Sequence, residues 1–226
     1  MNVLGSIGNT PLVRLEHLPG PRSADVLVKW EGANPTGSMK DRMALSMVEG
    51  AERRGDLRPG DRVVEYTGGS TGSSLALVCA VKGYEAHFVS SDAFAEKKLR
   101  TMRAFGANLD VIPSDEGRIT PALVDAIVSR ARELSVEPNT FWADQYNNVD
   151  NRAAYHGMAR EILDQTGNQL DAFVMSVGTG GCMSGNAEIL KDALPGVRCI
   201  AIEPEASKQL SGGPVGGHRI EGIGPG

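Results

Sequence analysis

Hydrophobic and polar positions follow two alternating periods along most of this chain. Short apolar runs of strand length lead into polar or glycine-rich loops, and these lead into segments in which apolar residues recur every three or four positions, as on one face of a helix. The runs predict strands at 11–15, 26–30, 62–66, 86–89, 109–112, 172–177 and 198–203. The segments predict helices at 40–55, 73–82, 95–105, 121–134, 152–165 and 182–194. Repeated strand–loop–helix units predict a layered α/β fold in which right-handed crossovers join parallel strands.

Two of these elements carry signals of their own. Thr120 followed by Pro121 is a typical helix start, an N-cap residue with proline at the first helical position. The run 172–177 is almost continuously apolar, which predicts a strand buried on both faces.

Composition and charge exclude several classes of function. The chain has 226 residues, 41% hydrophobic and 23% charged, which is ordinary for a globular protein of one large or two modest domains. A net charge of −5 and the lack of a basic run argue against a nucleic-acid-binding surface. No apolar stretch is long enough to span a bilayer, and the first residues lack the features of a signal peptide, so we expect a cytoplasmic protein.

Cysteines and histidines give no sign of a disulfide framework or a metal site. The three cysteines are odd in number and far apart in the chain: Cys79, Cys182 and Cys199. This usage fits a reducing compartment. The four histidines form no close ligand pair, so we expect no metal.

Lys40 is the first candidate for chemistry. It stands at the start of the helix expected at 40–55, directly after a Pro/Gly-rich loop and away from the centre of the apolar stripe. The positive end of the helix dipole disfavours a charged lysine there, and partial burial would lower its pKa further. Such an amine can act as a nucleophile in Schiff-base chemistry. The spacing alone, however, favours an ordinary solvated lysine.

Two loops between an expected strand and an expected helix are candidate anion sites. The segment 67–74 is rich in small hydroxyl residues, and the segment 178–182 is rich in glycine. At the carboxyl ends of parallel strands, backbone N–H groups and hydroxyls can hold a carboxylate or a phosphate. Met183 stands where a dinucleotide fingerprint needs glycine, which excludes a Rossmann site. Glycine-rich turns also occur for packing alone, but a Schiff-base lysine with two anion cradles is what a pyridoxal phosphate enzyme needs.

Several motifs together resemble the cysteine synthase (O-acetylserine sulfhydrylase) and cystathionine β-synthase group of fold type II pyridoxal phosphate enzymes. They occur in the group's order and cover nearly the whole chain, at 7–12, 34–42, 67–72, 144–146, 178–181 and 222–224. The resemblance implies a two-domain α/β fold like that of the tryptophan synthase β chain, with three-layer domains and helices on both faces of parallel sheets. It also implies a small mobile domain at 36–148 and a larger cofactor-binding domain built from 1–35 and 149–226.

The resemblance further implies roles for individual residues. Lys40 would carry pyridoxal 5'-phosphate, remove the substrate's Cα proton and then serve as acid and base. The remaining cofactor-binding positions would be Ser70, Gly178, Thr179, Gly180, Gly181 and Cys182. The substrate-binding positions would be Thr67, Gly68, Gly69, Ser70, Thr71, Gln145 and Gly222.

The implied reaction is a β-replacement on an activated L-serine such as O-acetylserine. A sulfur nucleophile replaces the β-substituent, which gives L-cysteine or a related amino acid, and the resemblance implies a homodimer. The alternatives are a β-eliminating serine or threonine dehydratase of the same fold and a non-catalytic homologue that binds a partner.

Some positions depart from the pattern of the group. Ser70 stands where the group commonly has asparagine, Gly68 where it often has serine, and Cys182 where it usually has threonine. The group's residue that faces the pyridine nitrogen would fall beyond position 226, so we expect the chain to be incomplete at its C-terminus.

Overall fold

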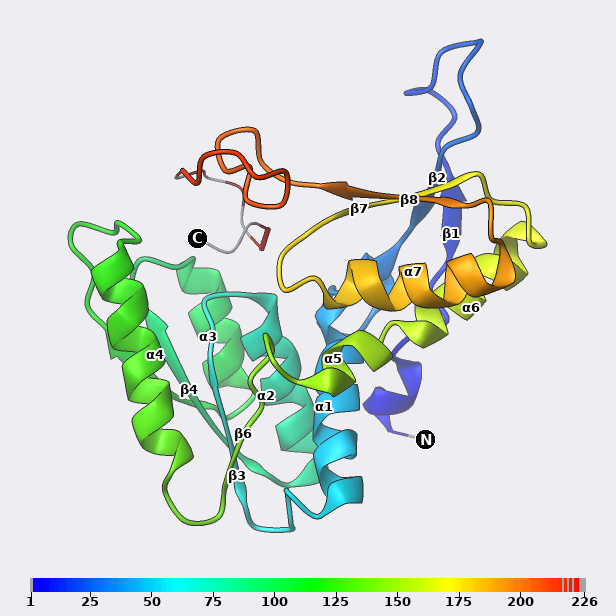
Figure 1. Ribbon diagram of the computed structural model, residues 1–226. Helices are drawn as coiled ribbons and strands as arrows, with labels where there is room; N and C mark the ends of the chain where they lie inside the picture. Colours follow the sequence, from blue (N-terminus) through cyan, green and yellow to red (C-terminus); the bar gives the residue numbers. More distant parts are fainter. Residues whose placement is uncertain (1, 217, 219, 221, 224–226) are drawn as a thin grey trace.

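The largest sheet has four parallel strands in the order β5-β4-β3-β6. The computed structural model describes residues 2–216, 218, 220, 222 and 223. The strands of this sheet are β3 (Arg62–Tyr66), β4 (Glu85–Ser91), β5 (Asn108–Ile112) and β6 (Thr140–Trp142). Helices connect these strands (Figure 1), so the expected parallel α/β arrangement is confirmed.

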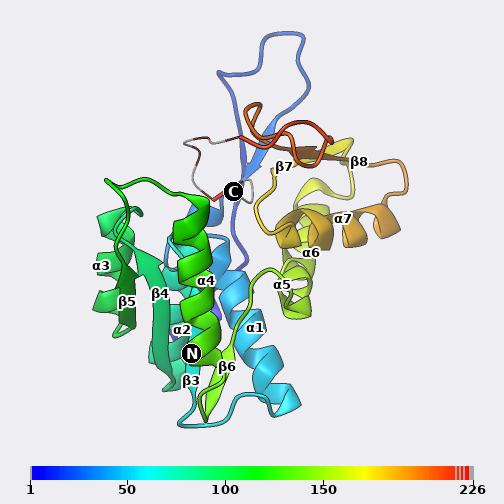
Figure 2. The same ribbon diagram turned by 60° about the vertical axis from the view of Figure 1, so that its left-hand side comes forward.

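Helices cover both faces of this sheet. On one face lies α4 (Pro121–Ser135), and on the other lie α2 (Ser70–Lys82) and α3 (Glu96–Ala104), with α1 (Lys40–Arg54) packed against α2. Alternation along the strands explains the layers, because neighbouring residues of a strand point to opposite faces. Val64 and Val89 pack with α4, whereas Val63 and Phe88 join the core on the other face. Figure 2 shows α4 running along its face of the sheet.

A second group of elements lies beside α1. It contains the antiparallel pair β1 (Leu12–Arg14) and β2 (Leu27–Lys29), and the parallel pair β7 (Ala172–Ser176) and β8 (Arg198–Ile202). Its helices are α5 (Val149–Ala153), α6 (His156–Thr166) and α7 (Gly181–Ala193), with short 3₁₀ turns η1 (Val3–Ser6) and η2 (Glu31–Ala33). One hydrophobic cluster runs from Met43 of α1 to Tyr155 and Met158 beside and within α6.

The expectation that the strand at 172–177 is buried on both faces is wrong for the described structure. Val174 of β7 is 51% exposed, and the other residues of the strand are only half-buried. The reason is that α6 and α7 lie on one side of the β7–β8 pair (Figure 1), and no described element covers Val174.

Two helix boundaries also differ from the expected ones. α2 begins at Ser70, three residues before the expected start, because the Thr67 hydroxyl accepts the N–H groups of Gly69 and Gly72 and so supports an earlier first turn. The helix expected at 152–165 is two helices, α5 and α6, that meet at Ala154 and Tyr155.

Among the described residues, none of the helices combines the length and the apolar character needed to cross a membrane.

Candidate functional site

Lys40 is the first residue of α1, and its amine has a distinctive environment. The side chain is half-buried, and within the described part of the chain its Nζ takes part in no hydrogen bond or salt bridge. Burial lowers the pKa of the Lys40 amine below its ordinary value, and the nearby Cys182 side chain offsets only part of this effect. An amine held in this way moves toward its uncharged form, which is the nucleophilic one.

Asp41 fixes the loop before Lys40 and ties it to α2. The side chain is fully buried, and its Oδ1 accepts hydrogen bonds from Thr36 Oγ1 at 2.5 Å and from Ser74 Oγ at 2.6 Å. Its Oδ2 accepts the Thr36 N–H at 2.7 Å. The first turn of α1 is therefore held against α2, whose own first turn carries Ser70 and Thr71.

Arg42 anchors the same turn to the second group of elements. Its guanidinium contacts Glu31 at 2.8 Å and Glu161 of α6 at 2.7 Å, and Lys29 of β2 also reaches Glu161 at 2.6 Å. Burial alone would raise the pKa of Glu161, but hydrogen bonds from Arg42 and Lys29 outweigh it and hold that pKa at about 2. Lys40 thus extends from a turn fixed on two sides.

The loop that joins β3 to α2 brings several predicted substrate-binding residues together. Thr67 holds the turn through the N–H groups of Gly69 and Gly72, at 3.2 and 3.3 Å from its Oγ1. Thr71 Oγ1 donates to Gln145 Oε1 at 2.8 Å, although 74 positions separate the two in the sequence. The structure therefore places Gln145 directly beside this loop.

Close packing explains the glycine at position 68. A Cβ added to Gly68 would lie 2.2 Å from the ring of Phe94, so the aromatic ring occupies the space that a side chain would need. Phe94 therefore covers this part of the loop.

The turn between β7 and α7 forms the second candidate cradle. Gly180 has a φ of +84°, a backbone conformation that favours glycine. A Cβ added to Gly178 would lie 2.6 Å from the Gly222 carbonyl oxygen, and one added to Gly181 would lie 2.0 Å from Asn151 Oδ1. The turn is therefore tightly packed and continues directly into the first turn of α7. The backbone N–H groups at that helix N-terminus have no intrahelical acceptor and favour a bound anion.

Cys182 has its thiol turned into the core. Its Sγ lies 3.6 Å from Asn186 Nδ2, and the residue is buried. Burial raises the pKa of the Cys182 thiol to about 12, so the thiol is protonated at neutral pH. The backbone N–H of Cys182, in the first turn of α7, is the group that remains available to an anion.

Asn151 joins the two loops, and it is a residue that the sequence patterns did not single out. Its Nδ2 donates to the Gln145 carbonyl oxygen at 2.6 Å and to Thr179 Oγ1 at 3.0 Å. The side chain is buried, and its Oδ1 has no hydrogen-bond partner among the described residues. The only signal for it in the sequence was its place in an amide-rich stretch that also holds Asn147 and Asn148.

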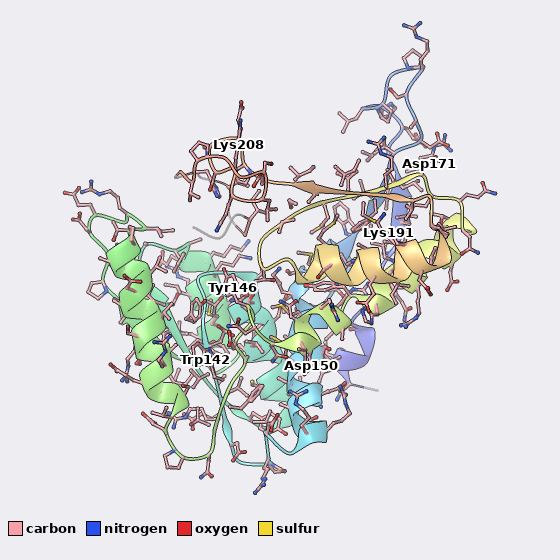
Figure 3. The ribbon with its side chains drawn as sticks, viewed as in Figure 1. Trp142, Tyr146, Asp150, Asp171, Lys191 and Lys208 are labelled. Atoms are coloured by element: carbon pink, nitrogen blue, oxygen red, sulfur yellow. The ribbon has the colours of Figure 1, made fainter. Side chains whose placement is uncertain are left out.

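An open pocket of about 230 Å³ lies at this junction. Its walls include Tyr146, labelled in Figure 3, with Asn148, Arg152, Thr179 and Ser184. Apart from Thr179, these residues were absent from the predicted site. The pocket combines neutral hydrogen-bonding groups with one guanidinium, a lining that suits an anionic group.

Three predicted residues, Thr71, Gln145 and Thr179, are therefore connected in one chain of contacts, through the unpredicted Asn151. Thr71 contacts Gln145, the Gln145 backbone contacts Asn151, and Asn151 contacts Thr179. Lys40 approaches the same region at Cys182. Chemically, the arrangement offers one nucleophilic amine and two anion cradles.

Comparison with known protein families gives a match over nearly the whole chain. The family described as pyridoxal-phosphate dependent enzyme matches residues 3–226. A cysteine synthase of Staphylococcus aureus is 41% identical over 227 residues, which is 100% of this chain and 71% of the relative. Cysteine synthase B of Pseudomonas aeruginosa is 41% identical over 207 residues, 91% of this chain and 67% of the relative.

Solved structures give the same picture. A crystal structure of O-ureido-L-serine synthase matches with a TM-score of 0.90 and 38% identity, covering 99% of this chain and 69% of that one. A cysteine synthase from Entamoeba histolytica matches with a TM-score of 0.87 and 38% identity, covering 99% and 66%. Together with the parallel sheets flanked by helices, these likenesses confirm the α/β fold class expected from the motifs. The chain belongs to the family of pyridoxal-phosphate dependent enzymes and groups within it with the cysteine synthases.

Proposed function

We propose that this chain catalyses a β-replacement on an activated L-serine such as O-acetylserine, with a sulfur nucleophile, and so forms L-cysteine or a related amino acid. The observation that carries the proposal is the Lys40 amine. It has no counter-ion among the described residues, and it lies near Cys182 of the second cradle, which Asn151 and Gln145 link to the 67–71 loop. The 41% identity to a cysteine synthase supports the substrate class.

The residues present fit pyridoxal phosphate. Its aldehyde calls for an uncharged amine, which burial favours at Lys40. Its phosphate calls for closely approaching backbone and hydroxyl donors, which the turn at Gly180 and Gly181 and the hydroxyl of Thr179 offer. Thr179 Oγ1 already accepts a hydrogen bond from Asn151, so its own hydrogen is free to be donated to the phosphate.

The protein's residues would divide the remaining work. When bound, pyridoxal phosphate supplies an electron sink for negative charge at the substrate's Cα. Lys40 Nζ takes the Cα proton and later returns a proton. The loop from Thr67 to Thr71 and the side chain of Gln145 hold the substrate's carboxylate, with Thr71 and Gln145 orienting each other. Gly222 packs against Gly178 and so supports the β7–α7 turn, which forms the cradle proposed for the phosphate.

A β-eliminating dehydratase is the enzymatic alternative. It would use the same lysine and the same cradles, but it would release a 2-oxo acid in place of a new amino acid. The similarity to cysteine synthases favours replacement over elimination. A Lys40 amine whose pKa is lowered by burial, with both cradles in place, argues against a non-catalytic homologue.

The proposal includes three further points that rest on the resemblance. The protein works as a homodimer in the cytoplasm, and the segment 36–148 acts as a small mobile domain against the rest of the chain.

Absorbance spectroscopy with product analysis tests the reaction. The purified chain is loaded with pyridoxal phosphate and dialysed, and spectra are taken before and after O-acetyl-L-serine and then sulfide are added. We expect a cofactor band that survives dialysis, changes with O-acetyl-L-serine and returns with sulfide while cysteine accumulates. Lys40→Ala should lose the retained band while keeping its far-ultraviolet circular dichroism. Lys97→Ala, at an exposed position of α3, is the matched control and should keep the band.

Other results would contradict the proposal in different ways. A 2-oxo acid formed in place of cysteine would identify an eliminating enzyme. A dialysis-resistant band in Lys40→Ala would assign the cofactor to another lysine.

A further inference from the structure

Lys98 of α3 reaches into the first turn of α2. Its Nζ donates to Ser70 Oγ at 3.2 Å, across 28 positions of sequence. Ser70 begins α2 and belongs to the proposed carboxylate loop. A cationic side chain from a different helix therefore contacts this loop. Lys98 itself belongs to none of the motifs that identified the loop.

The charge of Lys98 has no carboxylate partner within the described residues. The side chain is half-buried. Apart from Lys40, the other partly buried lysines among the described residues are paired, Lys29 with Glu161 at 2.6 Å and Lys82 with Glu52 at 2.9 Å. Glu96, which precedes Lys98 on the same helix, is engaged by Arg100. A partly buried ammonium without a counter-ion has lost part of its hydration and gained no ion pair in return. Binding an anionic ligand would supply that ion pair.

The hydrogen-bond pattern around Ser70 points the same way. An ammonium can only donate, so Ser70 Oγ accepts from Lys98 and its own hydrogen is left to donate elsewhere. Thr67 Oγ1 takes the N–H groups of Gly69 and Gly72. The N–H groups of Ser70 and Thr71 lie in the first helical turn, where intrahelical acceptors are lacking. Two N–H groups and one hydroxyl thus gather without an acceptor in the described structure, beside an ammonium whose one acceptor is Ser70 Oγ.

Phe94 adds a low-dielectric cover to this group of donors. Its ring packs on Gly68, so closely that a Cβ there would lie 2.2 Å away. Partial exclusion of water strengthens an electrostatic contact between a carboxylate and Lys98.

We infer that Lys98 is a substrate-positioning residue that, together with the Ser70 hydroxyl, gives the 67–71 loop the positive charge with which it binds the substrate's α-carboxylate. The inference rests on the proposed function, since it names a further residue of the same site. Lys98 polarises Ser70 and directs its hydrogen toward the bound carboxylate.

Isothermal titration calorimetry on the chain loaded with pyridoxal phosphate tests this inference. The probes are L-alanine, which has the carboxylate but no leaving group, and L-alaninamide, in which a neutral amide replaces the carboxylate. Lys98→Met should weaken L-alanine binding by about tenfold, the scale of a hydrogen bond to a charged group. Binding of L-alaninamide should stay the same as in the wild type. Lys98→Arg, which keeps the charge, should restore most of the affinity for L-alanine.

The controls separate a charge effect from a structural one. Lys97→Met removes an exposed lysine one position away and should leave both affinities unchanged. Added salt should weaken L-alanine binding more in the wild type than in Lys98→Met, because a charge interaction is screened. In a double-mutant cycle, Ser70→Ala should have a smaller effect in the Lys98→Met background than in the wild type, because the two residues act together.

Three outcomes would overturn the inference. Unchanged L-alanine binding in Lys98→Met would show that the ammonium does not take part. An equal loss for L-alanine and L-alaninamide would show a structural role only. A wild-type chain that holds the cofactor but binds neither probe would refute the proposed function itself, and the inference with it.

Discussion

At the scale of single residues, Glu65 shows how burial changes the protonation of a carboxyl group. It lies at the end of β3, is 0% exposed, and accepts the N–H groups of Tyr66 at 3.0 Å and Gln145 at 3.1 Å. Burial raises the pKa of the Glu65 carboxyl to about 8, more than these two hydrogen bonds lower it. The carboxyl therefore holds the backbone of Gln145 while it is itself protonated at neutral pH.

This raised pKa predicts how stability changes with pH. Between the ordinary pKa of a glutamate and about 8, the folded chain keeps a proton that the unfolded chain has released, so the free energy of unfolding falls as pH rises. The contribution is fully present below the ordinary pKa and lost above about 8. Urea denaturation at several pH values should show a decline of up to about 1 kcal/mol per pH unit from this group.

The matched variant for this prediction is Glu65→Gln, which cannot titrate. Its free energy of unfolding should vary less than that of the wild type between pH 5 and 8, even if its absolute value is lower because one N–H loses its acceptor. Parallel pH profiles for the two proteins would show that Glu65 does not titrate in this window.

Residue-scale prediction from the sequence reaches only residues whose signal lies in their own stretch of chain. Lys40 at a helix start and the glycines of the second cradle could be proposed for this reason, and the structure places them at the start of α1 and at the β7–α7 turn. Asn151 and Lys98 could not be proposed, because their contacts depend on how α5 meets the β7–α7 turn and how α3 packs on α2. Nothing in a single sequence records such distances.

At the scale of elements, the start of α4 can be tested directly. The expected N-cap is confirmed, since Thr120 Oγ1 accepts the Leu123 N–H at 3.2 Å and Pro121 follows it. Thr120→Ala should lower the free energy of unfolding by about 1 kcal/mol, measured by urea denaturation, because one N–H of the first turn loses its acceptor.

The control for the cap is Thr120→Ser, which keeps a hydroxyl at the same position. It should recover most of the loss. A serine variant as unstable as the alanine variant would mean that the Thr120 methyl group, and not the cap, stabilises this end of α4.

At this scale the sequence predicted the type and order of most helices and strands, but it was less accurate about where they begin and end and which of their faces are buried. The alternating periods gave the helices around the large sheet and its strands β3, β4 and β5, since hydrophobic spacing directly reflects which face is buried. They missed β6, which has only three residues and is too short to show a period. They missed the early start of α2, because Thr67 caps it from outside the periodic segment. They also misjudged Val174, because an apolar run does not tell which of its faces other elements will cover.

At the scale of the whole molecule, the proposed boundaries of the moving segment need a test. α1 belongs to the segment 36–148, yet Arg42 and Arg54 bind it to Glu161 and Asp150 outside that segment. These contacts would have to adjust if the segment moved as one body.

Distances between spin labels can show what moves. Cysteines are placed at three exposed positions in a chain whose Cys199 is replaced by serine: Arg53 of α1, Asp125 of α4 and Asp192 of α7. When L-alanine is added to the cofactor-loaded protein, the distances from Asp192 to Asp125 and to Arg53 should both shift, while the distance from Arg53 to Asp125 stays constant. A constant distance from Arg53 to Asp192 alongside a shift at Asp125 would place α1 with the larger, stationary part.

The amide of Asn151 holds the Gln145 backbone with one hydrogen bond and the Thr179 hydroxyl with another. A ligand that orders one of these loops thereby lowers the entropic cost of ordering the other. Thermodynamic linkage makes this effect reciprocal. Bound cofactor must raise the affinity for the amino acid by the same factor by which the bound amino acid raises the affinity for the cofactor. When pyridoxal phosphate is scarce in the cell, the affinity of the enzyme for this cofactor would therefore rise whenever the amino acid substrate is abundant.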